Sequence, residues 1–151
     1  MSTSDLEIIG RIERIDLPEW NFSGLDAKID TGAYTSSLHC HHIKPFKKNG
    51  EDWVHFFLLD PDHEAYTEKQ LEALISDQRE VKSSNGEIET RYFIQTQIRF
   101  YNEIHTIEFS LTDRSAMKYP LLIGRKFLQK GPFITDVTKK YMTKHKKTKE
   151  S

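Results

Sequence analysis

The tripeptide Asp30-Thr31-Gly32 has residue types that could carry out chemistry, and it follows Ala27 and Ile29, an apolar pair typical of a buried strand. A carboxylate at the end of a strand can activate water for attack on an amide if a second carboxylate nearby holds a proton. Two carboxyls about 3 Å apart cannot both ionise, so such a pair supplies base and acid together. The Thr31 hydroxyl could bond to neighbouring backbone, and Gly32 lets another segment come close. Because Asp and Gly are also ordinary turn residues, the tripeptide alone indicates either a turn or a catalytic site.

The chain contains one such segment, and no second Asp-Thr-Gly or Asp-Ser-Gly occurs in it. If the chemistry needs two carboxylates, the second must come from another copy of the chain, with the two Asp30 side chains meeting at a two-fold axis. The sequence therefore predicts a homodimer. The alternatives are a partner carboxylate within the chain, such as Asp113, and a domain without enzymatic activity.

Short stretches rich in β-branched and aromatic residues, separated by turn signals, dominate the sequence and predict a mostly β domain. The dipeptide Asn85-Gly86 most favours a tight hairpin. Along Glu87–Phe100, apolar and polar residues alternate as in a half-buried strand. The strands we expect are Glu7–Ile15, Leu25–Asp30, Ser36–Ile43, Trp53–Leu59, Val81–Ser83, Glu87–Phe100, Ile104–Leu111 and Phe133–Val137.

Two short segments favour helix instead. Thr67 and Gln70 form a capping-box pattern, and Leu71, Leu74 and Ile75 follow as an apolar stripe. A second helix is expected to begin near Arg125 and to end before Gly131-Pro132.

Length and charge restrict the classes of protein. The 151 residues suit one domain, and 23 acidic against 22 basic residues give no overall field that would select nucleic acid or membrane. Residues 139–151 hold six lysines and one acid, so we expect a domain over 1–138 and a basic, disordered tail over 139–151. The lone Cys40, the lack of a signal-peptide pattern and the lack of a long apolar run predict a cytoplasmic protein.

The run His39-Cys40-His41-His42 is the candidate for a metal site. On a strand, His39 and His41 share one face and Cys40 and His42 the other, so either pair could supply two zinc ligands, with His55 as a third. Adjacent histidines are also common as exposed polar residues. A zinc site at residues 39–42 is therefore the alternative hypothesis. The main hypothesis, a catalytic Asp-Thr-Gly segment, expects no cofactor.

The segment AKIDTGA resembles the active-site segment of retropepsin-like aspartic proteases. These enzymes also have an apolar pair before Gly-Arg at the start of a late helix, which here is LLIGRKFL, Leu121–Leu128. Between the two they place a hairpin flap, as around Asn85-Gly86. The segments IDTGAYTSSLH, WVHF, VKSSNGEIETR and LTDRSAMKYPLLIGRKFL, with Asp136 in the last strand, are similar to a bacterial family labelled ATP-dependent zinc proteases. The resemblance spans Ile9 to Val137.

This resemblance implies a retropepsin-like closed β-barrel and an aspartic peptidase, with Asp30, Thr31 and Gly32 as the catalytic segment. The sequence supports neither half of the family's label. The seven glycines form no phosphate-binding loop, and His63-Glu64 does not continue into His-Glu-x-x-His. Arg125, in the Gly-Arg pair, is expected to hold a carboxylate of a neighbouring segment or of the dimer mate.

Basic residues near the expected site suggest an acidic substrate. Lys28 lies two residues before Asp30 and so should point to the same side. Some family members occur beside ligases that add glutamate to proteins, which suggests acidic or glutamyl-modified substrates. A peptide-binding module without turnover is the alternative outside the enzymes. The expected substrate-binding residues are Lys28, Ala33, Ser84, Asn85, Gly86, Arg91 and Arg114.

Overall fold

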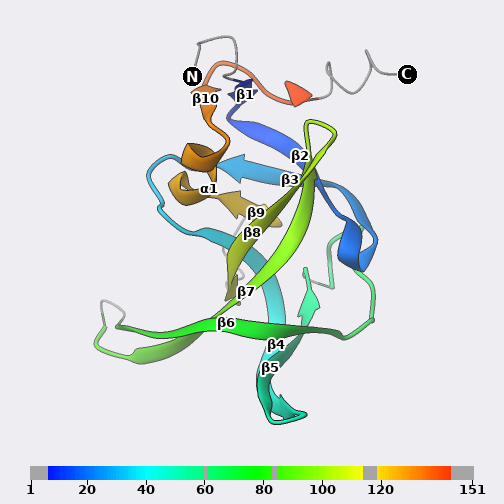
Figure 1. Cartoon of the computed structure of the whole chain (residues 1–151), viewed down its shortest axis with the longest axis vertical. Coiled ribbons are helices and arrows are strands. Elements are labelled where there is room, and N and C mark those ends of the chain that lie inside the picture. The colour runs from blue at the N-terminus through cyan, green and yellow to red at the C-terminus, as the bar shows by residue number, and fades with distance from the viewer. Residues whose placement is uncertain (1–6, 60, 83–84, 114–118, 144–151) are drawn as a thin grey trace.

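The computed structural model describes residues 7–59, 61–82, 85–113 and 119–143 (Figure 1). Within these ranges the chain is mostly β, with one short α-helix and one 3₁₀ turn. The elements in chain order are β1 (Glu7–Gly10), β2 (Ile12–Leu17), η2 (Pro18–Trp20), β3 (Phe22–Ile29), β4 (Ser36–Lys48), β5 (Glu51–Leu58), β6 (Leu71–Lys82), β7 (Ile88–Phe100), β8 (Glu103–Thr112), β9 (Leu121–Ile123), α1 (Arg125–Lys130) and β10 (Phe133–Asp136).

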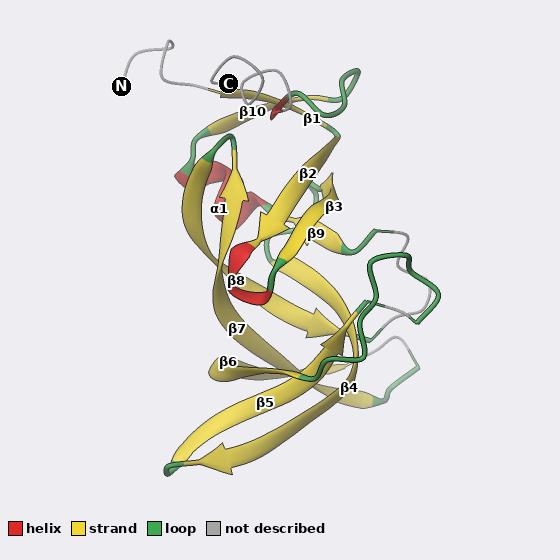
Figure 2. Cartoon of the chain, turned by 90° about the vertical axis from the view of Figure 1, so that its right-hand side faces the viewer, coloured by secondary structure: helices red, strands yellow, loops and turns green. Residues whose placement is uncertain are grey.

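The strands close into a barrel, as the sequence predicted. One ring runs β2–β3–β9–β4–β8–β7 and returns to β2 through the pair Asp16 and Arg99. The long strands β4 and β7 continue past this ring and pair with β5 and β6, which extend the sheet (Figure 2). Alternate side chains of β7 fill the interior. Ile94, Thr96, Ile98 and Phe100 are buried there, and the residues that alternate with them, Gln95, Gln97 and Arg99, are exposed.

The prediction of a helix over residues 67–75 is wrong, because β6 begins at Leu71. Leu71 and Ala73 are buried while Leu74 is 45% exposed, which is the period of a strand. Pairing with β5 on one side and β7 on the other outweighs the local helical pattern. The Gln70 side chain contacts His55 on β5 instead of capping a helix.

The expected first strand is divided at Arg11. β1 pairs in parallel with β10, whereas β2 pairs with β3. The small β1–β10 sheet lies at the end of the molecule opposite the β4–β5 hairpin (Figure 2). The short helix α1 and the final strand β10 are present where the sequence predicted them. Among the described residues, no helix has the length and apolar character needed to cross a bilayer.

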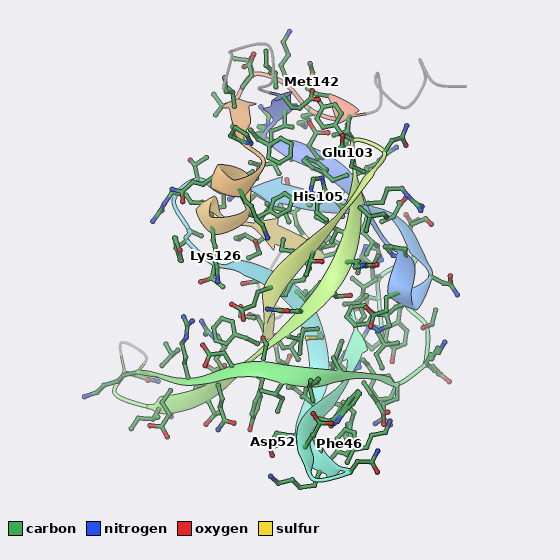
Figure 3. All side chains as sticks on the ribbon, viewed as in Figure 1. Phe46, Asp52, Glu103, His105, Lys126 and Met142 are labelled. Carbon is green, nitrogen blue, oxygen red and sulfur yellow. The ribbon has the colours of Figure 1, made fainter. Side chains whose placement is uncertain are left out.

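The part of the expected tail that the structure describes, 139–143, packs against the barrel. The Lys139 carbonyl accepts a hydrogen bond from the Arg11 amide at 2.8 Å. The fully buried Glu13 carboxylate accepts from the amides of Gly10, Met142 and Thr143 and from the Thr143 hydroxyl, at 2.7–3.1 Å. Met142 thus lies beside the terminal strands, far from Phe46 and Asp52 of the β4–β5 hairpin (Figure 3). Residues 139–143 thus contact β1 and β2, and residues 144–151 lie outside the described ranges.

Candidate active site

Asp30 stands at the end of β3, and the parallel strand β9 fixes its position. The Asp30 amide donates to the Ile123 carbonyl at 2.8 Å, continuing the β3–β9 ladder by one residue. A turn follows, in which the Ala33 amide donates to the Asp30 carbonyl at 3.2 Å. The Gly32 amide donates to Asp30 Oδ1 at 3.0 Å and so orients the carboxylate. Asp30 is half-buried and Thr31 and Gly32 are exposed, so the site is open at the surface of the chain.

Arg125, the first residue of α1, braces this turn. Its Nη1 donates to the Thr31 carbonyl at 3.0 Å, its amide donates to the Ala33 carbonyl at 2.8 Å, and its guanidinium carbon lies 5.7 Å from the Tyr34 ring centre. The sequence predicted that Arg125 holds a carboxylate. The structure shows instead that it holds the backbone of the Asp-Thr-Gly turn, which agrees with the expected structural role.

Gly124 permits the close packing of α1 on the turn. A Cβ at this position would lie 2.7 Å from the Tyr34 carbonyl oxygen and 2.8 Å from the Thr35 carbonyl group. The Gly124 amide also donates to Ser36 Oγ at 3.0 Å. The glycine is needed for this contact between two backbones, since its φ is ordinary at −97°.

We predict that Gly124→Ala displaces the Asp30 turn. Because backbone atoms cannot move aside as a side chain can, the substitution should cost about 1–3 kcal/mol of unfolding free energy. Urea denaturation measures this loss. The matched control is Gly50→Ala at the β4–β5 turn, where a Cβ has open space and only the positive φ of 78° opposes it. A Gly124→Ala variant as stable as wild type would contradict the packing argument.

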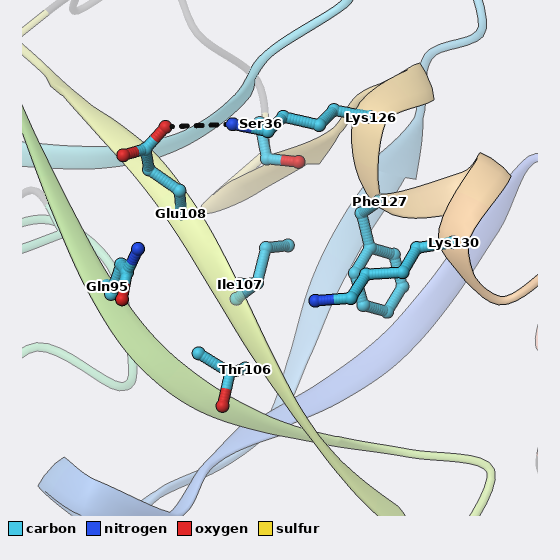
Figure 4. A pocket seen from close by; sticks show the side chains of 8 residues that line it. All are labelled: Ser36, Gln95, Thr106, Ile107, Glu108, Lys126, Phe127 and Lys130. Atoms are coloured by element: carbon cyan, nitrogen blue, oxygen red, sulfur yellow. Dashed lines mark hydrogen bonds and ion pairs between the residues drawn. The ribbon is translucent and has the colours of Figure 1, made fainter.

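α1 is fixed to the barrel by ion pairing as well as by apolar contact. A small cavity of about 120 Å³ separates α1 from β8. Lys126 reaches across it to Glu108 on β8 at 3.3 Å, while Phe127 is buried below (Figure 4). The Lys126 amide also donates to the Tyr34 carbonyl at 3.0 Å. Both contacts set the position of α1, and therefore the position of Arg125.

A continuous row of paired residues starts on β3 beside the Asp30 turn and crosses the outward-facing side of the sheet, where two of its members, Ser110 and Phe93, are covered by neighbouring residues. Residues paired across neighbouring strands point to the same side. The row begins at Lys28 on β3 and continues with one residue from each of the strands β9, β4, β8, β7 and β6. Two of these residues, Ser37 and Ser110, share a hydrogen bond of 2.8 Å. The row consists of Lys28, Leu122, Ser37, Ser110, Phe93 and Asp77. Lys28 and Asp30 share this outer face, as the sequence predicted, because Ala27 and Ile29 are buried between and beside them.

The other expected substrate-binding residues divide into two groups. Ala33 lies in the Asp30 turn, and Arg91 lies on the outer face of β7, two residues before Phe93. Asn85 and Gly86 form the turn between β6 and β7, with Gly86 at φ 89°. In Figure 1 this hairpin and the Asp30 turn extend toward the same, left-hand side of the molecule. Ser84 and Arg114 lie outside the described residues.

The histidine run does not form the metal site that the alternative reading required. His42 has φ 53° in a β-bulge, which breaks the expected alternation of faces. His41 Nδ1 is bonded to the Leu59 carbonyl at 2.8 Å. Cys40 is fully buried, and this burial raises the pKa of its thiol well above its usual range. Across the described ranges, no three His, Cys, Asp or Glu side chains converge as metal ligands.

Sequence reasoning missed several residues of this face. Arg79 on β6 pairs with Arg91, and Ser37 and Ser110 line the row, but each is an ordinary polar residue in the sequence. The hairpin signal at Asn85-Gly86 could not have found Arg79, because a two-residue turn there would pair Arg91 with Glu80, whereas the structure pairs Lys82 with Ile88 and therefore Arg79 with Arg91.

The geometry agrees with comparisons to known proteins. A "Probable alpha-L-glutamate ligase" of Shewanella halifaxensis is 40% identical over 119 residues, which are 79% of this chain and 26% of that protein. A protein of the same name from Desulfotalea psychrophila is 34% identical over 120 residues. The chain spans about a quarter of the length of these curated relatives.

A solved structure has the same fold. The crystal structure of Lpg0085, a protein of unknown function (DUF785) from Legionella pneumophila, superposes with a TM-score of 0.75 at 28% identity, covering 91% of this chain and 98% of that one. The family model described as "Retropepsin-like aspartic endopeptidase RimB" matches residues 8–146. That description confirms the predicted retropepsin-like barrel. It does not include the label of ATP-dependent zinc protease. The chain belongs to the RimB-like family.

Proposed function

We propose that this protein is an aspartic peptidase that acts as a homodimer. The observation that carries the proposal is the Asp30 turn: a surface carboxylate, oriented by the Gly32 amide and braced by Arg125, in a chain with a single Asp-Thr-Gly. A rigid support with an open face is what a shared pair of carboxylates requires. The second carboxylate comes from a second copy of the chain.

The reaction is hydrolysis of a peptide bond with consumption of one water. The ionised Asp30 removes a proton from water as the water oxygen attacks the carbonyl carbon, and the protonated Asp30 of the other copy donates to the carbonyl oxygen. Collapse of the tetrahedral intermediate then breaks the carbon–nitrogen bond, and a proton passes to the leaving nitrogen. Thr31 and Gly32 keep the carboxylate in place, and the β6–β7 hairpin covers the substrate.

Asp113 is a poorer partner for Asp30 than a second copy. Ser36 lies beside Gly124, close to the Asp30 turn, and pairs with Phe109 on β8. Asp113 follows Phe109 by four residues, or about 13 Å of strand. A shared proton needs carboxyls about 3 Å apart. Sedimentation should therefore show a dimer in any sample that cleaves an acidic peptide, and cleavage by a strict monomer would overturn the proposal.

The proposed substrates are acidic or glutamyl-modified chains. Lys28 places a positive charge on the same face as Asp30, where it can attract a carboxylate beside the scissile bond. The curated relatives are named as glutamate ligases, and about a quarter of their length matches this chain. A domain that binds and cleaves glutamyl chains is consistent with a relationship to proteins named as glutamate ligases.

We predict that Lys28→Leu lowers kcat/KM for acidic peptides about tenfold and leaves neutral peptides almost unchanged. The lost charge removes one attraction to the substrate, and leucine keeps the apolar stem. The measurement is kcat/KM for paired peptides that differ only by Glu and Gln next to the cleaved bond. Lys44→Leu, an exposed lysine of β4, is the control. An unchanged preference in Lys28→Leu would contradict the role of Lys28.

A further inference from the structure

Two arginines face one another midway along the β6–β7 hairpin. Arg79 on β6 pairs directly with Arg91 on β7, so both side chains leave the sheet on the same face. Arg79 is engaged: its Nε donates to Asp77 at 2.8 Å, and its guanidinium lies 4.5 Å from the centre of the Phe93 ring. Like charges directly opposite one another disfavour pairing of the strands. This pair therefore counts against the stability of the hairpin.

Arg91 differs from Arg79 in its contacts. Its Nε and Nη2 are buried and have no hydrogen-bond partner among the described residues, although Arg91 as a whole is half-buried. Buried donors without acceptors are unfavourable, and proteins satisfy nearly all of them. Arg91 thus has two donor nitrogens for which the described part of the chain supplies no acceptor.

A β-bulge puts the two arginines on this face together. The register shifts between Ile75 and Asp77, so that Asp77 pairs with Phe93 instead of Tyr92. Without the shift, the side chains of Asp77 and Arg79 would share a face with Tyr92, on the side opposite Arg91 and Phe93. Bulges of this kind re-aim side chains and are frequent next to active sites.

The outer row connects this position to Asp30. Phe93, beside Arg91, is four strand spacings from Lys28, which is at most about 19 Å along the curved sheet. An extended peptide advances about 3.3 Å per residue, so about six residues cover this length. Lys28 therefore marks one end of the row and the arginine pair the other, with Leu122, Ser37 and Ser110 between them.

We propose that Arg91, with Arg79, forms a subsite for a substrate carboxylate about six residues from the scissile bond. This inference rests on the proposed function and deepens it, because it requires acidic residues at two separated positions of the substrate. Because Nε and Nη2 are covered in the structure, the Arg91 side chain has to turn outward for a carboxylate to accept hydrogen bonds from both, in the two-point geometry that a guanidinium favours. The carboxylate then lies between the two positive charges. Specificity at this subsite is for a carboxylate, and an amide of the same shape binds less well.

The test uses the Asp30→Asn protein, which should bind peptide without cleaving it. A fluorescent peptide of eight glutamates is titrated, together with eight variants that each carry a single Glu→Gln. When the protein has Arg91, one of the eight single Glu→Gln substitutions, at a peptide position away from the scissile bond, should weaken peptide binding about tenfold. In Arg91→Gln, the all-glutamate peptide should bind about tenfold more weakly, and that one substitution should lose its effect while the others keep theirs. Arg91→Lys should restore part of the affinity.

Matched variants separate a binding role from a structural one. The control is Arg99→Gln, which should leave every peptide affinity unchanged. Arg99 lies on the same strand and face as Arg91, but it pairs with Asp16 where β7 meets β2 and closes the barrel. Because Arg91 has unsatisfied donors, Arg91→Gln should not lower Tm, whereas a structural arginine would. Equal affinities for all peptides in Arg91→Gln and its parent would overturn this inference alone. An Asp30→Asn protein that binds none of the acidic peptides would overturn the proposed substrate class with it.

Discussion

Asp30→Asn is expected to abolish peptide cleavage, with a loss of at least about 10³-fold in kcat, while the fold stays intact. Asparagine has the shape of aspartate, and its side-chain oxygen can still accept from the Gly32 amide, so the turn keeps its geometry. It cannot take a proton from water. The measurement is product formation by mass spectrometry, with Tm as the check on folding. Asp26→Asn, on the same strand and face, should retain activity within about twofold.

Mixing the Asp30→Asn and wild-type chains tests the shared site directly. If subunits exchange freely, an equal mixture contains about one quarter wild-type dimers, and only these hold two aspartates. Activity per wild-type chain should therefore fall to about half. Activity that stays proportional to the wild-type chain would show that each copy works alone. Peptide binding without products in both proteins would indicate a binding module.

Glu13→Ala is expected to lower the free energy of unfolding by about 3–5 kcal/mol. The Glu13 carboxylate is fully buried, and four hydrogen bonds end on it, from Gly10, Met142 and Thr143. Alanine leaves these donors without an acceptor and opens a cavity. For a domain of this size, Tm should fall by about 10 °C, and urea denaturation gives the free energy.

The control and the coupled variant make this prediction specific. Glu51→Ala, exposed at the β4–β5 turn, should change stability by less than about 0.5 kcal/mol. Removal of residues 139–151 should also destabilise the protein, because it takes away three of the four donors. The two changes together should cost clearly less than their sum, since they break the same contacts. Additive costs would show that Glu13 does not hold this segment.

Local chemistry made most of the barrel predictable from the sequence. Alternating apolar residues gave strand β7, and Asn85-Gly86 gave its hairpin, because both depend on neighbours within a few residues. The Gly-Arg pair gave the start of α1. The helix prediction for residues 67–75 failed for the opposite reason. Their local pattern fits a helix, but the segment from Leu71 onward pairs with β5 on one side and β7 on the other, and this long-range pairing decides the structure.

The candidate site shows the same division. Asp30, Thr31, Gly32 and Lys28 could be found from the sequence, because they are contiguous or two residues apart on one strand. The sequence also determined that one chain carries a single Asp-Thr-Gly. Only the tertiary structure decided that Arg125 binds the Thr31 carbonyl, that Glu13 holds residues 139–143, and that Arg79 faces Arg91. These contacts join segments far apart in the chain or depend on a bulge in register, and no local pattern of residues encodes such distances.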